Sequence, residues 1–308
     1  MAKKEWQVCT KKKKGSWDSV AHGWTKHICE ESALKQIYEM MRDRDSTVSE
    51  ITLYSVDDGG FVSTELTKNL IEWFKQKADE LNVKRVALGI SGGKDSTVVA
   101  GLGVAVFGKE NVFGLSMPNG VQSDIADAVR VIEHLGINSA TVNIKTVFDG
   151  IADQVSGFNG SDVAKTNLPA RLRMATLYAY AQTNDALVLN TCNLSEDCVG
   201  YATLFGDSCG SLAPISHLTT EEVMAVGDDL GLPYDLVHKT PVDGLQPLTD
   251  EQKLGFTYHE LNEHIRKGVK GPHYLKMLAM YQKNKFKTEI IRIPYFDPQL
   301  PNYFEIGE

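Results

Sequence analysis

From Ser63 onward, short apolar runs alternate along the chain with segments of helical length, and this alternation most restricts the possible folds. The short runs predict buried strands, and the longer segments carry apolar residues at helical spacing or are rich in small residues. A helix capped by Ser63 is expected before the first strand. The strands are RVALGI, NVFGLSM, ATVNI and ALVLNT, and the helices are DSTVVAGLGVAVFG, SDIADAVRVIEHLG, LPARLRMATLYAYAQ and TTEEVMAVGDDLG. We expect a doubly wound α/β fold, with a mainly parallel sheet and helices on both faces.

In a sheet of this kind, ligands bind beyond the carboxyl ends of the strands. Three polar loops follow expected strands at that edge: SGGKDS, MPNGVQSD and NTCNLSED. Two further stretches of low periodicity, residues 155–166 and 239–253, are long for a compact domain. We expect both to be mobile loops that cover an active site.

The first sixty residues do not follow the alternating pattern, so we divide the chain into an N-terminal extension, residues 1–60, and an α/β domain, residues 61–308. Within the extension we expect a helix over residues 31–44 and a strand over residues 50–56. The lysine run from Lys11 to Lys14 is interpreted as a solvated or disordered tail, in preference to an arm that binds nucleic acid. The extension has no assigned role.

Composition narrows the class of function. The chain has 308 residues, 42% of them apolar, and a net charge of -8, which argues against binding to nucleic acid or a membrane surface and favours a small-molecule enzyme. No apolar stretch reaches membrane-spanning length, and the first residues lack the apolar segment of a secretory signal, so we expect a cytoplasmic protein. The cysteines are scattered, odd in number and not at zinc spacing, so we expect free thiols and no zinc: Cys9, Cys29, Cys192, Cys198 and Cys209.

The loop SGGKDS joins an expected strand to the start of an expected helix. It is not the common P-loop, because Leu88 and Asp95 stand where that motif requires a glycine and a hydroxyl residue. Glycines let the backbone approach a ligand, the helix N-terminus attracts oxyanions, and Ser91 and Ser96 can donate hydrogen bonds. A carboxylate beside phosphate needs a divalent cation between them, so Asp95 indicates magnesium pyrophosphate. The alternative is a glycine turn in which Asp95 only caps the helix.

These residues, together with five further segments, carry a family resemblance. The loop SGGKDS resembles the signature of the ATP pyrophosphatases, which split ATP into AMP and pyrophosphate. The other segments resemble, in order and spacing, the ammonia-dependent NAD synthetases: MPNGVQSD, NLPARLRM, NTCNLSED, GYATLFGDSCGSLAP and DEQKLGFTYHELN. The resemblance extends from about Ser63 to Lys267 and rests on several independent motifs in register.

The resemblance implies a reaction in which the carboxylate of nicotinic acid adenine dinucleotide (deamido-NAD) attacks the α-phosphate of ATP. Pyrophosphate leaves, and ammonia then displaces AMP from the acyl adenylate to give NAD. It also implies roles for individual residues. Asp95 and Glu196 hold Mg²⁺ and are catalytic; ATP or pyrophosphate is bound by Ser91, Gly92, Gly93, Lys94, Asp95, Ser96, Gln122 and Thr191; deamido-NAD is bound by Asn167, Arg171, Asp207 and Lys239.

The chain departs from the family pattern at several positions. A lysine that reaches the ATP phosphates in the family is replaced here by Thr220, and Lys94, Lys165 or Lys239 is left to supply the charge. Family positions around the dinucleotide are also altered, at Leu204 and Ser211, so we expect a divergent member.

Family members are homodimers, so the resemblance implies a homodimer here. An aromatic residue of one subunit faces nicotinate bound to the other, and Phe74 is a candidate for that role, although core packing also accounts for it. The alternative functions are another ATP pyrophosphatase, such as a GMP synthetase or a tRNA-thiolating enzyme, and a noncatalytic relative that binds nucleotide. The expected partners are deamido-NAD, ATP and ammonia, with no nucleic acid and no membrane.

Overall fold

The computed structural model describes residues 5–12, 25–27, 48–56, 65–122, 125–239 and 249–290. The expected helix at 31–44, the Ser63 cap and most of the loop at 239–253 lie outside these ranges. The chain divides into two compact units. The smaller comprises Met1–Thr64 with Asp229–Gly231, and the larger comprises Glu65–Asp228 and Leu232–Glu308.

The smaller unit contains an antiparallel sheet with the strand order β2-β1-β3, formed by β1 (Glu5–Lys12), β2 (Thr25–His27) and β3 (Val48–Val56). The strand expected at residues 50–56 is confirmed as part of β3. The lysine run was interpreted as a solvated or disordered tail, and the disordered alternative is wrong for its first two residues. Lys11 pairs with Glu50 and Lys12 with Val48, because β3 is long enough to continue the ladder that far.

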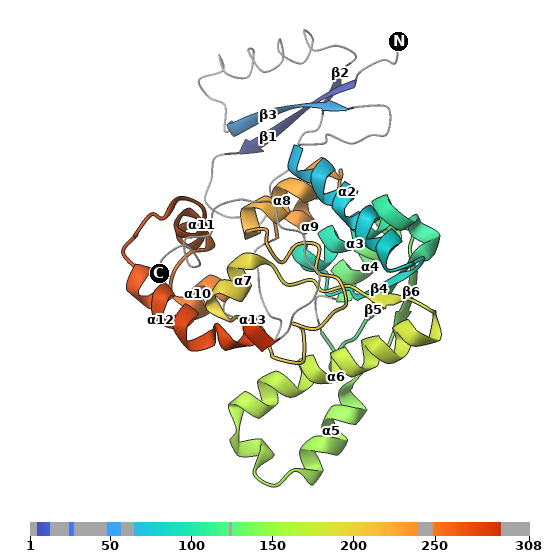
Figure 1. Cartoon of the computed structure of the whole chain (residues 1–308), viewed down its shortest axis with the longest axis vertical. Helices are drawn as coiled ribbons and strands as arrows, with labels where there is room; N and C mark the ends of the chain where they lie inside the picture. Colours follow the sequence, from blue (N-terminus) through green and yellow to red (C-terminus); the bar gives the residue numbers. More distant parts are fainter. Residues whose placement is uncertain are drawn as a thin grey trace. The chain divides into compact units, whose positions relative to one another are not determined.

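The larger unit is built around a parallel sheet with the strand order β6-β5-β4-β7 (Figure 1). Its strands are β4 (Val86–Gly89), β5 (Val112–Ser116), β6 (Asn138–Thr141) and β7 (Leu187–Val188). The expected parallel α/β sheet is therefore confirmed. The chain runs outward from β4 through β5 to β6 and then returns to the other side of β4 with β7. The direction of winding thus reverses between β4 and β7, which is where α/β sheets open a crevice for ligands.

The helices of the larger unit surround this sheet (Figure 1). Their bounds are α2 (Glu65–Glu80), α3 (Lys94–Phe107), α4 (Ile125–Leu135), α5 (Lys145–Gln154), α6 (Asp162–Thr183), α7 (Leu194–Val199), α8 (Thr220–Asp229), α9 (Tyr234–Val237), α10 (Asp250–Leu254), α11 (Tyr258–Lys267), α12 (Tyr274–Asn284) and α13 (Phe286–Ile290). Two short 3₁₀ turns occupy Lys109–Asn111 and Phe158–Gly160. No helix among these described segments is long and apolar enough to cross a membrane.

Successive strand residues point to opposite faces of the sheet, and helices cover both faces. On one face α3 lies close to the strands, since a Cβ added to its Gly103 would lie 3.4 Å from the Val112 side chain. On the other face α6 packs Leu177 and Ala181 into a core with Ala87 of β4 and Val188 of β7. A second core joins α7 to the C-terminal helices α10, α11 and α12. This second core packs the helices α10, α11 and α12 against α7, which starts beside the carboxyl edge of the sheet.

Phe74 of α2 is fully buried, and its ring packs edge-to-face against Phe107 at a centroid distance of 5.3 Å. A side chain with no exposed surface cannot face a nucleotide on a second subunit. The core-packing explanation is therefore confirmed for Phe74, and the candidate role at a dimer interface is wrong.

The stretch 155–166 is not the mobile loop that we expected. It contains the 3₁₀ turn Phe158–Gly160 and the first turn of α6, whose N-cap Ser161 accepts a hydrogen bond from the backbone N–H of Ala164 at 3.2 Å. The helix then continues through Pro169, which lies within it. The start of α6 is largely exposed, and a helical segment with few buried residues has no apolar stripe. This is why the sequence of this stretch shows little apolar periodicity.

Candidate active site

A cavity of about 630 Å³ lies beyond the carboxyl ends of β4, β5 and β7, within the larger unit. Its wall is formed by the loop after β4, the loop after β5, residues of α6, the start of α7 and the segment around residues 200–209. The cavity lies where the direction of winding reverses between β4 and β7. The loops that follow these two strands diverge there and leave a crevice between them. The three polar loops predicted at this edge all contribute to the cavity.

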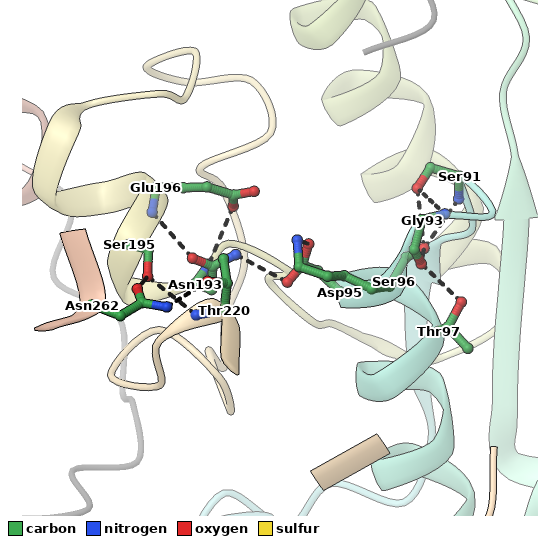
Figure 2. Close-up of polar contacts among 11 residues, drawn as sticks. Ser91, Gly93, Asp95, Ser96, Thr97, Asn193, Ser195, Glu196, Thr220 and Asn262 are labelled. Atoms are coloured by element: carbon green, nitrogen blue, oxygen red, sulfur yellow. Dashed lines mark hydrogen bonds and ion pairs between the residues drawn. The ribbon is translucent and has the colours of Figure 1, made fainter. Parts of the chain in front are cut away.

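The SGGKDS loop is held open by its own hydrogen bonds and by close packing. Gly92 has a φ of +77°, and a Cβ there would lie 2.7 Å from the Asp127 side chain, so only glycine fits. The backbone N–H of Gly93 donates to Ser91 Oγ at 3.2 Å, and the hydroxyl oxygens of Ser91 and Ser96 lie 3.1 Å apart (Figure 2). These groups stand at the N-terminus of α3, where helix geometry favours a bound anion.

Asn193 links this loop to the start of α7 (Figure 2). Its side-chain NH₂ donates to Asp95 Oδ1 at 2.9 Å, and its side-chain oxygen accepts from the backbone N–H of Glu196 at 3.1 Å. The Glu196 side chain in turn accepts a hydrogen bond from the Asn193 backbone N–H, which completes a capping box for α7. Asn193 therefore ties together the two loops that carry the predicted metal carboxylates.

Lys94 lies beside these carboxylates with only 5% of its side chain exposed. Its ammonium donates to Asp95 Oδ2 at 2.9 Å and lies 5.8 Å from the centre of the Tyr258 ring. Burial by itself lowers the pKa of Lys94, but the charges of Asp95, Glu196 and Asp250 outweigh burial and raise that pKa above its usual value. Lys94 is therefore a permanent cation at the cavity wall.

The donors at this position fit a magnesium ion. Burial, followed by the charge of Asp95, raises the pKa of Glu196 well above its usual range, so the two carboxylates repel each other and a cation between them would relieve that repulsion. No group of three or more His, Cys, Asp or Glu side chains within the described ranges could hold a metal. Magnesium is commonly bound by one or two carboxylates together with substrate phosphates, which is what this pair offers.

Most of the other predicted site residues also line the cavity. They are Ser91, Gly93, Lys94, Ser96, Gln122, Asn167, Thr191, Asp207 and Lys239, along with Asp95 and Glu196. Asn167 and Asp207 are further connected through Thr203, whose hydroxyl donates to Asn167 Oδ1 at 3.0 Å and whose backbone N–H donates to Asp207 Oδ1 at 2.8 Å. The side chains predicted to bind the dinucleotide on α6 and on the 200–209 segment therefore form one connected wall.

Two predicted residues are not part of the cavity lining. Gly92 packs against α4 and acts through the shape of the loop. The guanidinium of Arg171 donates to the Leu204 carbonyl at 3.2 Å in an exposed position. The role of Arg171 in binding deamido-NAD stays a prediction.

Comparison with known proteins shows which enzymes this chain resembles in sequence and fold. The NAD synthase family model matches residues 66–293. The NH(3)-dependent NAD(+) synthetase of Thermococcus sibiricus is 42% identical over 195 residues, which cover 63% of this chain and 76% of the relative. The enzyme of the same description from Mycoplasmopsis pulmonis is 37% identical over 246 residues, covering 75% of this chain and 95% of the relative.

This chain belongs to the NAD synthase family.

Solved structures of related enzymes have the same fold. The NMN synthetase from Francisella tularensis is 31% identical and has a TM-score of 0.69. The match covers 75% of this chain and 98% of the Francisella chain. An NH3-dependent NAD synthetase from Campylobacter jejuni is 28% identical and has a TM-score of 0.61. The match covers 74% of this chain and 97% of the Campylobacter chain. As an NAD synthase family member the chain is an ATP-binding ligase that forms a carbon–nitrogen bond. The comparisons support this family and do not support the other ATP pyrophosphatases or a noncatalytic relative.

Thr220, where the family resemblance led us to expect a lysine, is closed off from the cavity in this NAD synthase. The Thr220 backbone N–H donates to Ser195 Oγ at 3.1 Å, Ser195 Oγ donates to Asn262 at 2.7 Å, and Asn262 Nδ2 donates to Thr220 Oγ1 at 2.9 Å (Figure 2). Thr220 is buried and does not line the cavity. The polar triangle therefore replaces a charged side chain with a neutral, internally satisfied contact.

Three polar residues that shape the site of this NAD synthase were not predicted from the sequence. Arg173 lines the cavity, and its Nε donates to the Met117 carbonyl at 2.9 Å. Asp250 also lines the cavity and accepts a hydrogen bond from the Tyr201 hydroxyl at 2.9 Å, and Asn193 joins the two loops. Arg173 lies two residues from Arg171, so helical spacing would have separated them, because side chains two apart point to different sides of a helix.

Proposed function

We propose that this chain amidates deamido-NAD to NAD, using ATP and free ammonia, through an acyl-adenylate intermediate. The observation that carries the proposal is the cavity at the switch point of the sheet, which joins the SGGKDS loop to the Asp95, Asn193 and Glu196 group. A free carboxylate is a poor acyl donor, so adenylation is required before ammonia can form the amide. The relatives named NH(3)-dependent NAD(+) synthetase support the choice of substrates.

In this mechanism the substrate carboxylate attacks the α-phosphorus of ATP, and the bond to pyrophosphate breaks. The N–H groups at the start of α3, with the hydroxyls of Ser91 and Ser96, receive the departing pyrophosphate. Gln122 and Thr191 contact ATP from the loops after β5 and β7. Mg²⁺ held by Asp95 and Glu196 would neutralise the charge that builds on the phosphates.

Ammonia then attacks the acyl carbon, and AMP leaves with one oxygen of the original carboxylate. Asn167 of α6, Asp207 of the 200–209 segment and Lys239 after α9 orient the dinucleotide, while Arg171 supports that wall through the Leu204 carbonyl. Holding both substrates in one cavity converts a reaction between separate molecules into one between groups already in place.

Lys94 is the lysine that we propose supplies the positive charge absent at Thr220. Lys165 does not line the cavity, and its ammonium lies 3.6 Å from Asp162 on an exposed part of α6. Lys239 does line the cavity, but its ammonium donates to Asp127 at 2.6 Å. Lys94 alone of these three points its ammonium at Asp95.

We further propose a cytoplasmic homodimer in which residues 1–60 form an extension separate from a synthetase domain of residues 61–308. The match of the family model from residue 66 supports the division. Exposed apolar side chains on or next to α5 and α6 support a protein contact by this part of the chain: Val147, Val155 and Val163.

The experiment that tests the proposed function is a steady-state assay of the purified chain with ATP, ammonium and one of two acceptors. The acceptors are deamido-NAD and nicotinic acid mononucleotide, because one related structure is an NMN synthetase. We expect NAD and AMP in equal amounts from deamido-NAD and much slower turnover of the mononucleotide. Preference for the mononucleotide would overturn the choice of substrate, and turnover of neither acceptor would overturn the function.

The same assay tests the residues that are proposed to bind deamido-NAD. Replacing Asn167 or Arg171 by Ala should raise the KM for deamido-NAD by a factor of about ten, with little change in the KM for ATP. Asn167→Ala removes a side chain that lines the cavity, and Arg171→Ala removes the hydrogen bond to the Leu204 carbonyl that supports the same wall. Arg85→Ala is the matched control, since Arg85 donates to the Asn184 carbonyl and does not line the cavity. Equal effects on both substrates would show that the assignment is wrong.

A further inference from the structure

Asp95, the proposed metal carboxylate on α3, already has both oxygens engaged. Oδ1 accepts from the side-chain NH₂ of Asn193 at 2.9 Å, and Oδ2 accepts from the Lys94 ammonium at 2.9 Å. The ion pair is shielded from water, because 5% of the Lys94 side chain and 18% of the Asp95 side chain are exposed. A divalent cation that binds Asp95 must therefore compete with a cation that belongs to the chain itself.

The surroundings of Lys94 hold it in this position. Its ammonium lies 5.8 Å from the centre of the Tyr258 ring, and the charges of Glu196 and Asp250 also act on it. The Tyr201 hydroxyl donates to Asp250 at 2.9 Å and fixes that carboxylate. The buried Tyr258 hydroxyl has no hydrogen-bond partner among the residues that the structure describes, so this pocket retains an unused polar group beside the carboxylates.

The other lysines that line the cavity have different partners. Lys239 donates to Asp127, and Lys287 donates to the backbone carbonyls of Gly200 and Ala202 at 2.7 and 2.9 Å. Among the cavity lysines within the described ranges, Lys94 is the one hydrogen-bonded to a proposed metal ligand. Removing a buried ammonium from several carboxylates leaves their charge uncompensated, which strongly favours the entry of another cation.

We propose that Lys94 is a resident cation that keeps divalent metal off Asp95 and Glu196 until a phosphate group arrives. The phosphate then takes the ammonium as its hydrogen-bond donor, which frees Asp95 Oδ2 for the metal. The ammonium stays paired throughout the exchange, because a charge-assisted bond to phosphate replaces the one to the carboxylate. Metal and phosphate consequently bind together, and each raises the affinity for the other by the same factor. The identity of the phosphate as that of ATP rests on the proposed function.

The test measures Mn²⁺ binding by calorimetry to the full chain without nucleotide, for the wild type, Lys94→Met and Lys165→Met. We expect Lys94→Met to bind Mn²⁺ at least about tenfold more tightly than the wild type, since the competing charge is gone. Lys165→Met removes the same charge from an exposed position and should match the wild type. In a second arm, saturating pyrophosphate should raise Mn²⁺ affinity in the wild type and much less in Lys94→Met.

Two additional variants keep the test decisive. Lys94→Gln provides a polar replacement if a thermal melt shows that Lys94→Met is unfolded, and Lys94→Arg retains the charge and should still exclude Mn²⁺. Equal Mn²⁺ affinity of the wild type and the neutral variants, including no binding by any of them, would overturn the proposal. The measurement is independent of turnover. A chain that shows the expected Mn²⁺ pattern but makes no NAD would overturn the proposed function and leave this inference in place.

Discussion

Asp95→Asn should reduce the release of pyrophosphate from ATP and deamido-NAD by roughly a thousandfold or more, because it removes one of two carboxylates placed to hold a cation at the phosphates. The amide has nearly the shape of the carboxylate, and its oxygen can still accept from Asn193. In this variant the Lys94 ammonium still has two negatively charged neighbours, Glu196 and Asp250. We therefore expect the fold to persist, with a thermal melt close to that of the wild type.

Asp149→Asn is the matched control for this change. Asp149 forms an exposed ion pair with Lys145 on α5 and does not line the cavity, and exposed pairs contribute little. The control should release pyrophosphate at the native rate. Near-native release by Asp95→Asn, measured with a coupled pyrophosphate assay, would remove the proposed metal role of this residue.

The purified 308-residue chain should make NAD from ammonium, while glutamine freed of ammonium should support little or no NAD formation. Hydrolysis of glutamine requires a nucleophilic cysteine with an activating partner in a shaped pocket. Within the larger unit, burial raises the pKa of Cys192 well above its usual range, which keeps that thiol protonated and unreactive. Cys9 and Cys29 lie outside the residues that the family model matches.

Neutral ammonia is the nucleophile in this account, so pH provides a second check. At a fixed and limiting total ammonium concentration, the rate of NAD formation should rise with pH below the ammonium pKa, until another group titrates. Robust turnover with glutamine, accompanied by release of glutamate, would overturn this prediction and assign a glutaminase role to the chain.

The sequence predicted the parallel sheet because its strands are short, apolar and separated by segments of helical length. It also placed Ser91, Asp95 and Glu196 at one edge, since the carboxyl ends of parallel strands meet there. It did not predict that β7 returns beside β4, because strand order depends on how the helices pack and not on any one strand. That return is what brings Asn193 within 2.9 Å of Asp95.

Other parts of the site were hidden for related reasons. The first turn of α6 has few buried residues, so its periodicity is weak and the stretch resembled a loop. The role of Asp250 depends on its contact with Tyr201, 49 residues away in sequence, and spacing rules do not reach that far. Lys94 was a candidate from its place in the loop, but only the structure shows that its ammonium is buried against Asp95. Local motifs therefore predicted the chemistry, while long-range packing determined which charges meet.

In the proposed reaction the substrate carboxylate is activated as an acyl adenylate before ammonia attacks. The most direct measurement uses deamido-NAD with both carboxylate oxygens labelled with ¹⁸O, incubated with ATP, Mg²⁺, ammonium and the purified chain. One labelled oxygen should appear in each AMP, because the carboxylate oxygen that attacked the α-phosphorus leaves with it, and the other should remain in the amide of NAD. Label in pyrophosphate or in inorganic phosphate, or AMP formed without label, would contradict the account.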